Sequence, residues 1–592
     1  MKIHADYEII MTLFIVGTES MGMNKSRTSS AKQDLLFALG INAVLLGVFL
    51  CLFTPYYDTN DDWFLSNFVN GAIAEKSARM VYINVIVGAL LKGLYTLTPA
   101  VSWYALMQYA ILFASFTAIT WILLQRCELI PALALSIGFV SIFGIDAYIV
   151  VQYTKTTAAA TVSGVMLIFY SLSKEKGTKG RRMSMTAGIM LALLGGMYRY
   201  YEFLAAGAVI CWTIIDPLTD AIKCADGGVK CRLRRAFETA RPFILLLLLF
   251  GAVRVIDTAA YSGPEWADYI EYNKARTLVM DHGTPHYSMY EDGYKALGIS
   301  EDYVSEIRSW NFFDPDKLDT QTMYNIAALR GERRLIGGDT AVTDFFPICV
   351  PQLVREWFFA GFVLAAAIWL LFGRHDLRAI ISITLSAVVC LCQFIYFFLS
   401  DRWGIYRVNY GIMLALAAGI LWYIPGGKPC KWQISTAAIL VLTITLQCVY
   451  MTKWKDEFAY YRSNEEEISN NEKSIQMLVD DGHLIMLDSR IIMGRKFFSS
   501  QPMFGQAIPG IADRIAAMGG WHITPIIVSN LSHYGIRNPY KDAINNPDVY
   551  MVTEEIDILL SCMREYTPNA EAALIEPLSS QTGLLIYSIT AD

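Results

Sequence analysis

The residues best suited to chemistry lie in one short stretch, Tyr56 to Trp63, which holds three carboxylates within five positions: Asp58, Asp61 and Asp62. An apolar run from Leu35 to Phe53 comes directly before this stretch, and that run is about long enough to cross a bilayer. A charge costs far more in the centre of a bilayer than at its edge, so the acids are expected at the membrane surface, facing a polar cavity. We therefore predict that they form the catalytic edge of a membrane enzyme.

Carboxylates in this position have two chemical uses. One of them can act as general base on an incoming hydroxyl, provided that it lies within hydrogen-bond reach and has a suitable pKa. Adjacent carboxylates can also hold a divalent cation such as Mg²⁺ or Mn²⁺, with Asp61 and Asp62 as the candidate ligands. The structural alternative is helix capping, in which Asp58, Asn60 or Asp61 caps a helix that starts near Trp63. Capping accounts for one acid better than for three.

Basic residues next to other predicted spans are candidate ligands of a lipid phosphate. A guanidinium pairs with phosphate through two hydrogen bonds, and positive charge is depleted in outer loops unless something holds it there. The alternative is snorkelling, or pairing with Asp401 or Glu202. The candidates are Arg199, Arg402, Arg407 and Lys155.

Aromatic and polar residues near these positions are candidates for binding substrate. Tyr57 lies beside the acids, and Tyr272 and Arg276 lie in a long loop that also holds Asp281 and Gly283. Tyrosine, arginine and aspartate at close spacing suit a sugar, which takes hydrogen bonds and an aromatic face. The alternative for this part of the loop is a solvated amphipathic helix that ends at a glycine turn.

Composition identifies a polytopic membrane protein. Of the 592 residues, 54% are hydrophobic and only 17% charged, against about a quarter in soluble proteins. No basic patch interleaved with aromatic residues indicates nucleic-acid binding. The eleven cysteines are scattered, with no zinc-ligand spacing and no disulfide framework.

Apolar blocks and basic loops predict eleven membrane spans and their direction. Residues 1–33 are expected to be a cytoplasmic tail and residues 34–452 a membrane domain, with outer loops at 54–102 and 257–346. The acids, the three arginines, the long loop and the C-terminal region then share the outer side. The predicted spans are 35–53, 103–124, 131–151, 156–172, 185–197, 203–215, 242–255, 357–372, 379–399, 410–424 and 434–450.

Two further parts are predicted outside the membrane. Residues 62–74 and 82–97 have the composition of helices that lie along the outer surface. Residues 453–592 are predicted to form a small extracytoplasmic α/β domain, because helical stretches at 465–478 and 555–565 alternate with apolar strands at 483–488, 549–553 and 583–589. We find no glycine-rich phosphate loop in that region.

Together these features resemble the GT-C superfamily of membrane glycosyltransferases. The resemblance rests on the many spans, on Asp61-Asp62 with Asp58 nearby in the first outer loop, and on the surface helices and outer domain that follow. The stretch Tyr56–Tyr104 also resembles polytopic proteins of Gram-positive bacteria. The resemblance implies inverting transfer of a sugar from a polyprenyl-phosphate carrier to a cell-envelope acceptor, such as a glycan or a teichoic-acid-like polymer. In such an enzyme Asp61 would be the base, Asp62 or Asp58 would orient the acceptor or hold a metal, and the outer arginines would stabilise the departing phosphate.

Two other functions are compatible with the sequence. A transporter or flippase of lipid-linked sugars would need polar residues deep in several spans and, commonly, repeat symmetry, and the main mid-span charge is Asp146. A non-catalytic assembly protein would tolerate loss of all three acids.

Overall fold

The computed structural model describes residues 30–72, 75–223, 228–331, 342–400, 402–424, 439–447, 449, 465–494, 497–498, 503–504 and 510–591. The expected N-terminal tail falls almost wholly outside these residues. So does much of the eleventh predicted span, of which 439–447 are helical.

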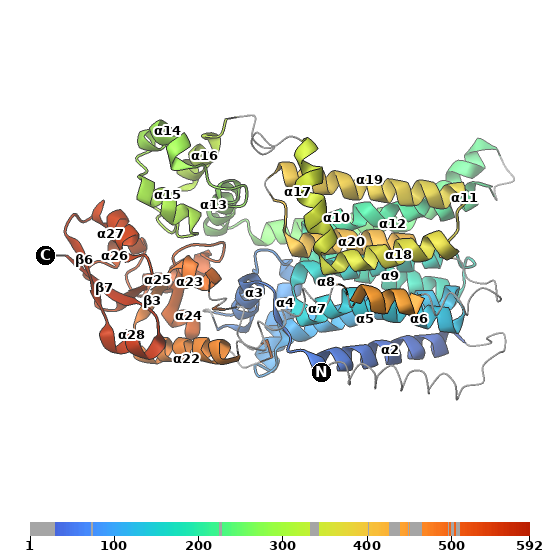
Figure 1. Ribbon diagram of the computed structural model, residues 1–592, viewed down its shortest axis with the longest axis horizontal. Helices are drawn as coiled ribbons and strands as arrows, with labels where there is room; N and C mark the ends of the chain where they lie inside the picture. Colours follow the sequence, from blue (N-terminus) through green and yellow to red (C-terminus); the bar gives the residue numbers. More distant parts are fainter. Residues whose placement is uncertain are drawn as a thin grey trace.

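The chain is a multi-pass membrane protein whose helices form one bundle (Figure 1). Six helical segments of the described chain are long and apolar enough to cross a bilayer, or seven if a bent pair counts as one. They are α2 (Ala31–Leu52), α5 (Trp103–Arg126), α6 with α7 (Leu129–Phe139 and Ile145–Ile149, joined by a π turn at Val140–Gly144), α10 with α11 (Tyr200–Ile210 and Ile215–Lys223, joined by a 3-10 turn at Cys211–Ile214), α12 (Val229–Ala260) and α19 (Leu377–Leu399).

Other predicted spans are helical but shorter or less apolar. The pair α17 (Val342–Arg355) and α18 (Trp357–Phe372) bends by 89° at its break. The central helix α8 (Tyr153–Leu172) is buried along almost its whole length and carries threonines that lower its hydropathy. The remaining two are α9 (Lys179–Tyr198) and α20 (Tyr406–Leu421). The count of eleven spans and their direction therefore remain predictions.

A two-residue parallel ladder connects the stretch Tyr56–Trp63, here called the acidic loop, to the bundle. Strand β1 (Tyr56–Tyr57) pairs with β2 (Val150–Val151), which directly precedes α8. The amide of Asp58 continues the ladder by donating to the carbonyl oxygen of Val151 at 3.0 Å. The segment that carries Asp58 is therefore fixed against the start of the most buried helix.

The two predicted surface helices are present with shifted ends. Helix α3 (Asn60–Asn70) stops at Gly71, whose φ of +87° suits a residue without a side chain. Helix α4 (Val85–Leu97) begins at Asn84, whose side chain accepts from the amide of Ile86 at 3.0 Å.

The segment from Pro264 to Ala328 folds into a group of short helices. The stretch around Tyr272 and Arg276 is helical, as the structural alternative predicted, and its helix ends just before Gly283, whose φ is +78°. The elements are α13 (Pro264–Met280), a 3-10 turn at Tyr287–Met289, α14 (Glu291–Ala296), α15 (Glu301–Arg308) and α16 (Thr320–Ala328).

The C-terminal region forms a five-stranded sheet with helices, in the strand order β4-β3-β5-β7-β6. Strands β4, β3 and β5 are parallel, whereas β7 runs antiparallel to β5 and β6. The predicted strands correspond to β3 (Leu484–Leu487), β5 (Val549–Val552) and β7 (Ile586–Ala591), and the predicted helices to α22 (Glu465–Asp481) and α27 (Ile556–Arg564). The other elements are α23 (Ser489–Gly494), α24 (Ile511–Arg514), β4 (Ile515–Ala517), α25 (Pro525–Ser532), α26 (Pro539–Asp542), β6 (Ala570–Leu574) and α28 (Glu576–Thr582).

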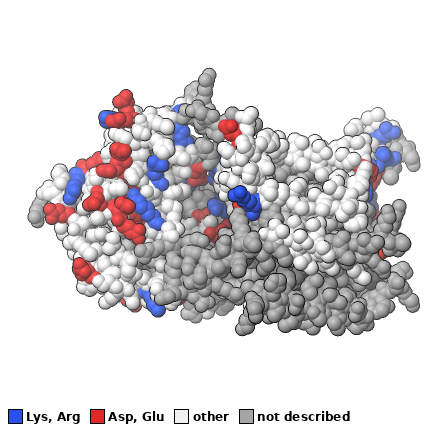
Figure 2. Space-filling view, in the orientation of Figure 1, with Lys and Arg blue, Asp and Glu red and all other residues white. Residues whose placement is uncertain are grey.

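Charge is distributed along the long axis as a membrane protein requires. On the face shown in Figure 2, charged side chains gather over the C-terminal domain and the α13–α16 group, and again at the far end of the bundle, with a largely uncharged surface between them. The far end holds α11, where Arg374 bonds Asp216 at 2.6 Å, and it lies opposite the C-terminal domain (Figure 1). The acidic loop and α3 lie at the end that faces the C-terminal domain.

Helices α8 and α9 cross at a point where only glycine fits. A Cβ atom on Gly188 would lie 2.6 Å from the carbonyl oxygen of Gly164, which is backbone and cannot rotate away. We expect Gly188→Ala to destabilise the protein by about 2 kcal/mol, the usual order for overpacking in a core. Thermal unfolding of the purified protein checks this, with Gly93→Ala as control because a Cβ there meets nothing within 4 Å. An equal melting temperature for both variants would contradict the tight crossing.

Candidate functional site

The first turn of α3 sends its two acids in different directions. Successive residues of a helix are about 100° apart around its axis, so Asp61 and Asp62 cannot face the same partner. Asp62 points into the protein and is fully buried, whereas the side chain of Asp61 keeps 17% of its surface exposed. One acid is therefore available to a ligand and the other is part of the core.

Asp62 joins α3 to α5 and α8. Its Oδ1 accepts from the hydroxyl of Tyr104 at 2.8 Å, the side-chain amide of Gln108 at 3.0 Å and the backbone amide of Tyr153 at 3.2 Å. Burial raises the pKa of Asp62 from 3.8 to about 8, against the lowering effect of these hydrogen bonds. A carboxyl that is largely protonated at neutral pH is poorly suited to accept another proton or to bind a cation.

Asp61 faces two groups from distant parts of the chain. Its Oδ1 accepts from the indole Nε1 of Trp521, in the C-terminal domain, at 2.7 Å. Its Oδ2 lies 3.8 Å from Nη2 of Arg407, at the start of α20. A carboxylate held in this way, with a guanidinium beside it, has the geometry of a base next to an anion site.

Arg199, at the break between α9 and α10, packs its guanidinium against a stacked pair of tyrosine rings. Its guanidinium carbon lies 4.6 Å from the ring centre of Tyr82 and 5.2 Å from that of Tyr153, and it donates to the hydroxyl of Tyr153 at 2.8 Å. The charge of Arg199 interacts with that of Asp61 and, more weakly, with that of Glu202. Arg407 lies within electrostatic range of both Asp61 and Arg199.

Glu202 lies buried beneath the two arginines. Its side chain leans over Gly411 on α20, where a Cβ atom would come within 1.9 Å of Oε1. Arg199 and Arg407 are its charged neighbours. The sequence suggested Glu202 only as a partner of an outer arginine, and the structure packs it against α20 within electrostatic range of both Arg199 and Arg407.

Lys155 is occupied by carboxylates of its own. Its Nζ lies 2.9 Å from Oδ1 of Asp146 and 3.9 Å from Oδ2 of Asp58, and it donates to the carbonyl oxygen of Val150. The second oxygen of Asp146 accepts from the hydroxyl of Tyr406 at 2.8 Å. The buried pair of Lys155 and Asp146 thus fixes Tyr406, the residue before Arg407. Lys155 and Asp58 therefore lie beside the site and support its structure.

The remaining candidates lie further out. Arg402 and Arg276 share Asp281, at 3.2 and 3.6 Å. The charge of Arg276 also acts on Tyr82 and His522, which places it behind the Tyr82 ring as seen from Asp61. Tyr272 donates to the carbonyl oxygen of Phe312 and belongs to the packing of α13. Tyr57 is buried against Tyr104, behind Asp62.

The site therefore joins three of the predicted residues, Asp61, Arg199 and Arg407, with three that the sequence did not indicate: Tyr82, Tyr153 and Trp521. Tyrosines are common at membrane interfaces, so the residue type alone did not single out Tyr82 and Tyr153. The local sign of Trp521 is the pair Gly519-Gly520 before it, which allows a close approach of the backbone.

The carboxyl groups do not fit a divalent cation. Oδ1 of Asp62 is taken by three donors in the core, and Asp61 faces an indole N–H and a guanidinium, which a cation would have to displace. Among the described residues, no group of three or more histidine, cysteine, aspartate or glutamate side chains is arranged to hold a metal. We therefore derive no step through a metal ion.

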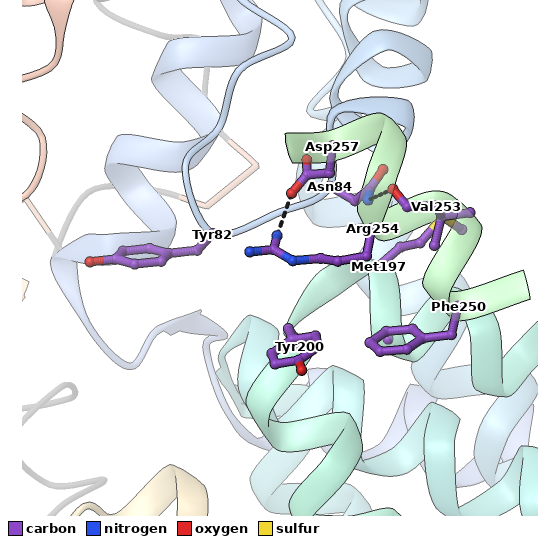
Figure 3. A pocket seen from close by; sticks show the side chains of 9 residues that line it. Tyr82, Asn84, Met197, Tyr200, Phe250, Val253, Arg254 and Asp257 are labelled. Carbon is purple, nitrogen blue, oxygen red and sulfur yellow. Dashed lines mark hydrogen bonds and ion pairs between the residues drawn. The ribbon is translucent and has the colours of Figure 1, made fainter. Parts of the chain in front are cut away.

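A small pocket lies beside Tyr82, between the segment before α4 and the helices α9, α10 and α12 (Figure 3). Arg254 bonds Asp257 at 2.6 Å above the stacked rings of Tyr200 and Phe250. Helix α12 lines one side of the pocket, and leucines of the same helix are exposed on the outside of the bundle. The pocket thus lies between the bilayer-facing surface and the ring that holds Arg199.

No protein-family model and no curated protein matches the sequence. A solved structure that matches is described as the crystal structure of ArnT from Cupriavidus metallidurans bound to undecaprenyl phosphate. The match covers 94% of this chain and 98% of that chain, with 10% sequence identity and a TM-score of 0.39. At this identity and TM-score the match carries no family, substrate or residue role over to this chain.

The raised pKa of Asp62 predicts a pH-dependent stability. Because its folded pKa of about 8 exceeds the unfolded value of 3.8, the buried neutral form stabilises the fold fully below about pH 4. That contribution is lost by up to about 1.4 kcal/mol per pH unit as the pH rises to about 8. Asp62→Asn keeps a neutral acceptor at Oδ1, so the variant should gain in melting temperature relative to the wild type as the pH rises from 5 to 8.

Any fixed cost of the new amide is the same at every pH and does not affect this slope. Melting curves of both proteins across that range check the prediction, and a constant difference between them would contradict it.

Proposed function

We propose that the protein is a membrane glycosyltransferase of the GT-C type, which moves a sugar from a polyprenyl-phosphate carrier to an acceptor hydroxyl at the outer face. The observation that supports this most strongly is one accessible carboxylate, Asp61, at 3.8 Å from the guanidinium of Arg407 and within electrostatic range of that of Arg199, at one end of an apolar bundle. A base and an anion site side by side are what the transfer needs.

In the proposed reaction, the acceptor oxygen attacks the anomeric carbon of the sugar while Asp61 takes the proton of that hydroxyl. The bond between the anomeric carbon and the phosphate oxygen breaks, and the electron pair leaves with the polyprenyl phosphate. Direct displacement inverts the anomeric centre. Negative charge grows on the phosphate in the transition state, so the fixed donors of Arg199 and Arg407 lower the barrier.

Tyr82 and Tyr153 hold Arg199 in place for this role. A guanidinium that packs against two rings and donates to one of their hydroxyl groups keeps its orientation and loses little freedom when it binds an anion. The prenyl chain would lie in the bilayer beside the bundle. An acceptor of the cell envelope would enter between the bundle and the C-terminal domain, and the cytoplasmic position of the other end follows the basic loops.

Arginine variants test the proposal. The charge-removing changes Arg199→Gln and Arg407→Gln should each lower kcat by about 100-fold, since a lost donor to developing charge costs roughly that much. The assay uses purified protein in nanodiscs, a panel of synthetic polyprenyl-phosphate hexoses and a cell-envelope fraction of the source organism as acceptor. Release of free polyprenyl phosphate is measured by mass spectrometry.

The matched control is Arg378→Gln, which removes an exposed ion pair with Asp220 at the far end of the bundle. It should retain the wild-type rate. If the wild type releases no polyprenyl phosphate and instead moves the lipid-linked sugar across the bilayer, the protein is a flippase and the proposal is wrong.

A further inference from the structure

Trp521 is one of the side chains through which the C-terminal domain contacts the acidic loop and α3, together with Phe498 and His522. Trp521 lies in the loop after β4, and this loop contacts the membrane domain. Gly519 passes so close to the loop after α15 that a Cβ atom would lie 1.9 Å from the carbonyl oxygen of Trp310. Gly520 has a φ of +113°, which a residue with a side chain rarely adopts. The two glycines thus set the direction of the next side chain.

Trp521 is held on all sides. The hydroxyl of Tyr269 donates to its backbone oxygen, and the ring of Tyr82 lies 4.8 Å from its own. The next residue, His522, stacks flat on Phe64 of α3 at 3.9 Å. Burial lowers the pKa of His522 to about 3, so its ring is neutral and packs as an aromatic group. The indole therefore has little freedom to turn.

The orientation of the Asp61 carboxylate follows from that of the indole. An indole N–H can only donate, and here it donates to Oδ1 at 2.7 Å. With Oδ1 fixed, the carboxylate cannot rotate freely, and Oδ2 is left on the side of Arg407. A general base works only when its lone pair points at the proton, so a fixed rotation contributes directly to the rate.

We propose that Trp521 is a positioning residue for Asp61, and that the C-terminal domain thereby completes the active site. This inference rests on the proposed function. It gives the domain a part in the reaction that does not require it to bind a substrate of its own. It also places the acceptor side of Asp61 at the boundary between two domains, where Tyr82 and Trp521 form one aromatic wall.

The first test is of the contact and needs no activity. The protein is labelled with 5-fluorotryptophan, and its 13 tryptophans are observed by fluorine NMR. The resonance missing from Trp521→Phe is that of Trp521, and Trp369→Phe identifies a reference whose indole donates to the carbonyl oxygen of Arg374 at the far end. Asp61→Asn should shift the Trp521 resonance and leave that of Trp369 unchanged. An unshifted Trp521 resonance would overturn the inference whatever the activity of the protein.

The second test is kinetic and uses the assay with polyprenyl-phosphate hexoses. Trp521→Phe keeps the aromatic ring and removes only the N–H, so we expect kcat to fall about tenfold with the KM for the lipid donor unchanged. Trp369→Phe, which removes an equivalent indole N–H, should behave like the wild type. An unchanged kcat in Trp521→Phe, or a fall in kcat matched by a rise in KM and a loss of melting temperature, would show that Trp521 only supports the fold.

The two tests separate the inference from the function on which it rests. If the wild type is inactive on every donor of the panel but the Trp521 resonance responds to Asp61→Asn, the glycosyltransferase proposal fails and the coupling of the two side chains stands. If the wild type is active and the resonance does not respond, the function stands and the role of Trp521 is refuted.

Discussion

Two adjacent carboxyl groups on one helical turn cannot serve the same partner, and this constraint organises the whole site. Asp62 turns inward and joins α3 to α5 and α8 through three hydrogen bonds. Because that anchor fixes the rotation of α3, Asp61 is turned outward, to the C-terminal domain and to α20. The core acid thus sets the position of the exposed one without taking part in its chemistry.

Neighbouring structural groups also determine where the two arginines of the site lie. Arg199 lies where α9 stops and α10 begins, and its guanidinium packs against the stacked rings of Tyr82 and Tyr153. Arg407 follows Tyr406, which the buried pair of Asp146 and Lys155 holds in place. A helix break and a buried ion pair are both unfavourable in a membrane. Here the break directs Arg199, and the ion pair directs Arg407, toward Asp61.

Apolar length and basic loops predicted many helices of the bundle and placed Asp61, Arg199, Arg402 and Arg407 on one side. The structure puts Arg407 beside Asp61, whereas Arg402 pairs with Asp281. The sequence did not separate Asp61 from Asp62, because the rotation of α3 depends on Tyr104 and Gln108 of another helix. It missed the β1–β2 ladder, whose strands have two residues each, and β4 and β6, which are short or weakly apolar. Trp521 could not be found from sequence, since its contact joins positions 460 residues apart.

The central claim is that one acid of the pair does the chemistry and the other holds the fold. The most direct measurement compares initial rates of sugar transfer by Asp61→Asn and Asp62→Asn, under conditions where both variants are folded. The account predicts that Asp61→Asn loses at least about 100-fold, the contribution of a general base, while Asp62→Asn keeps a rate within a few-fold of the wild type. Equal losses in the two variants, or a larger loss in Asp62→Asn, would contradict it.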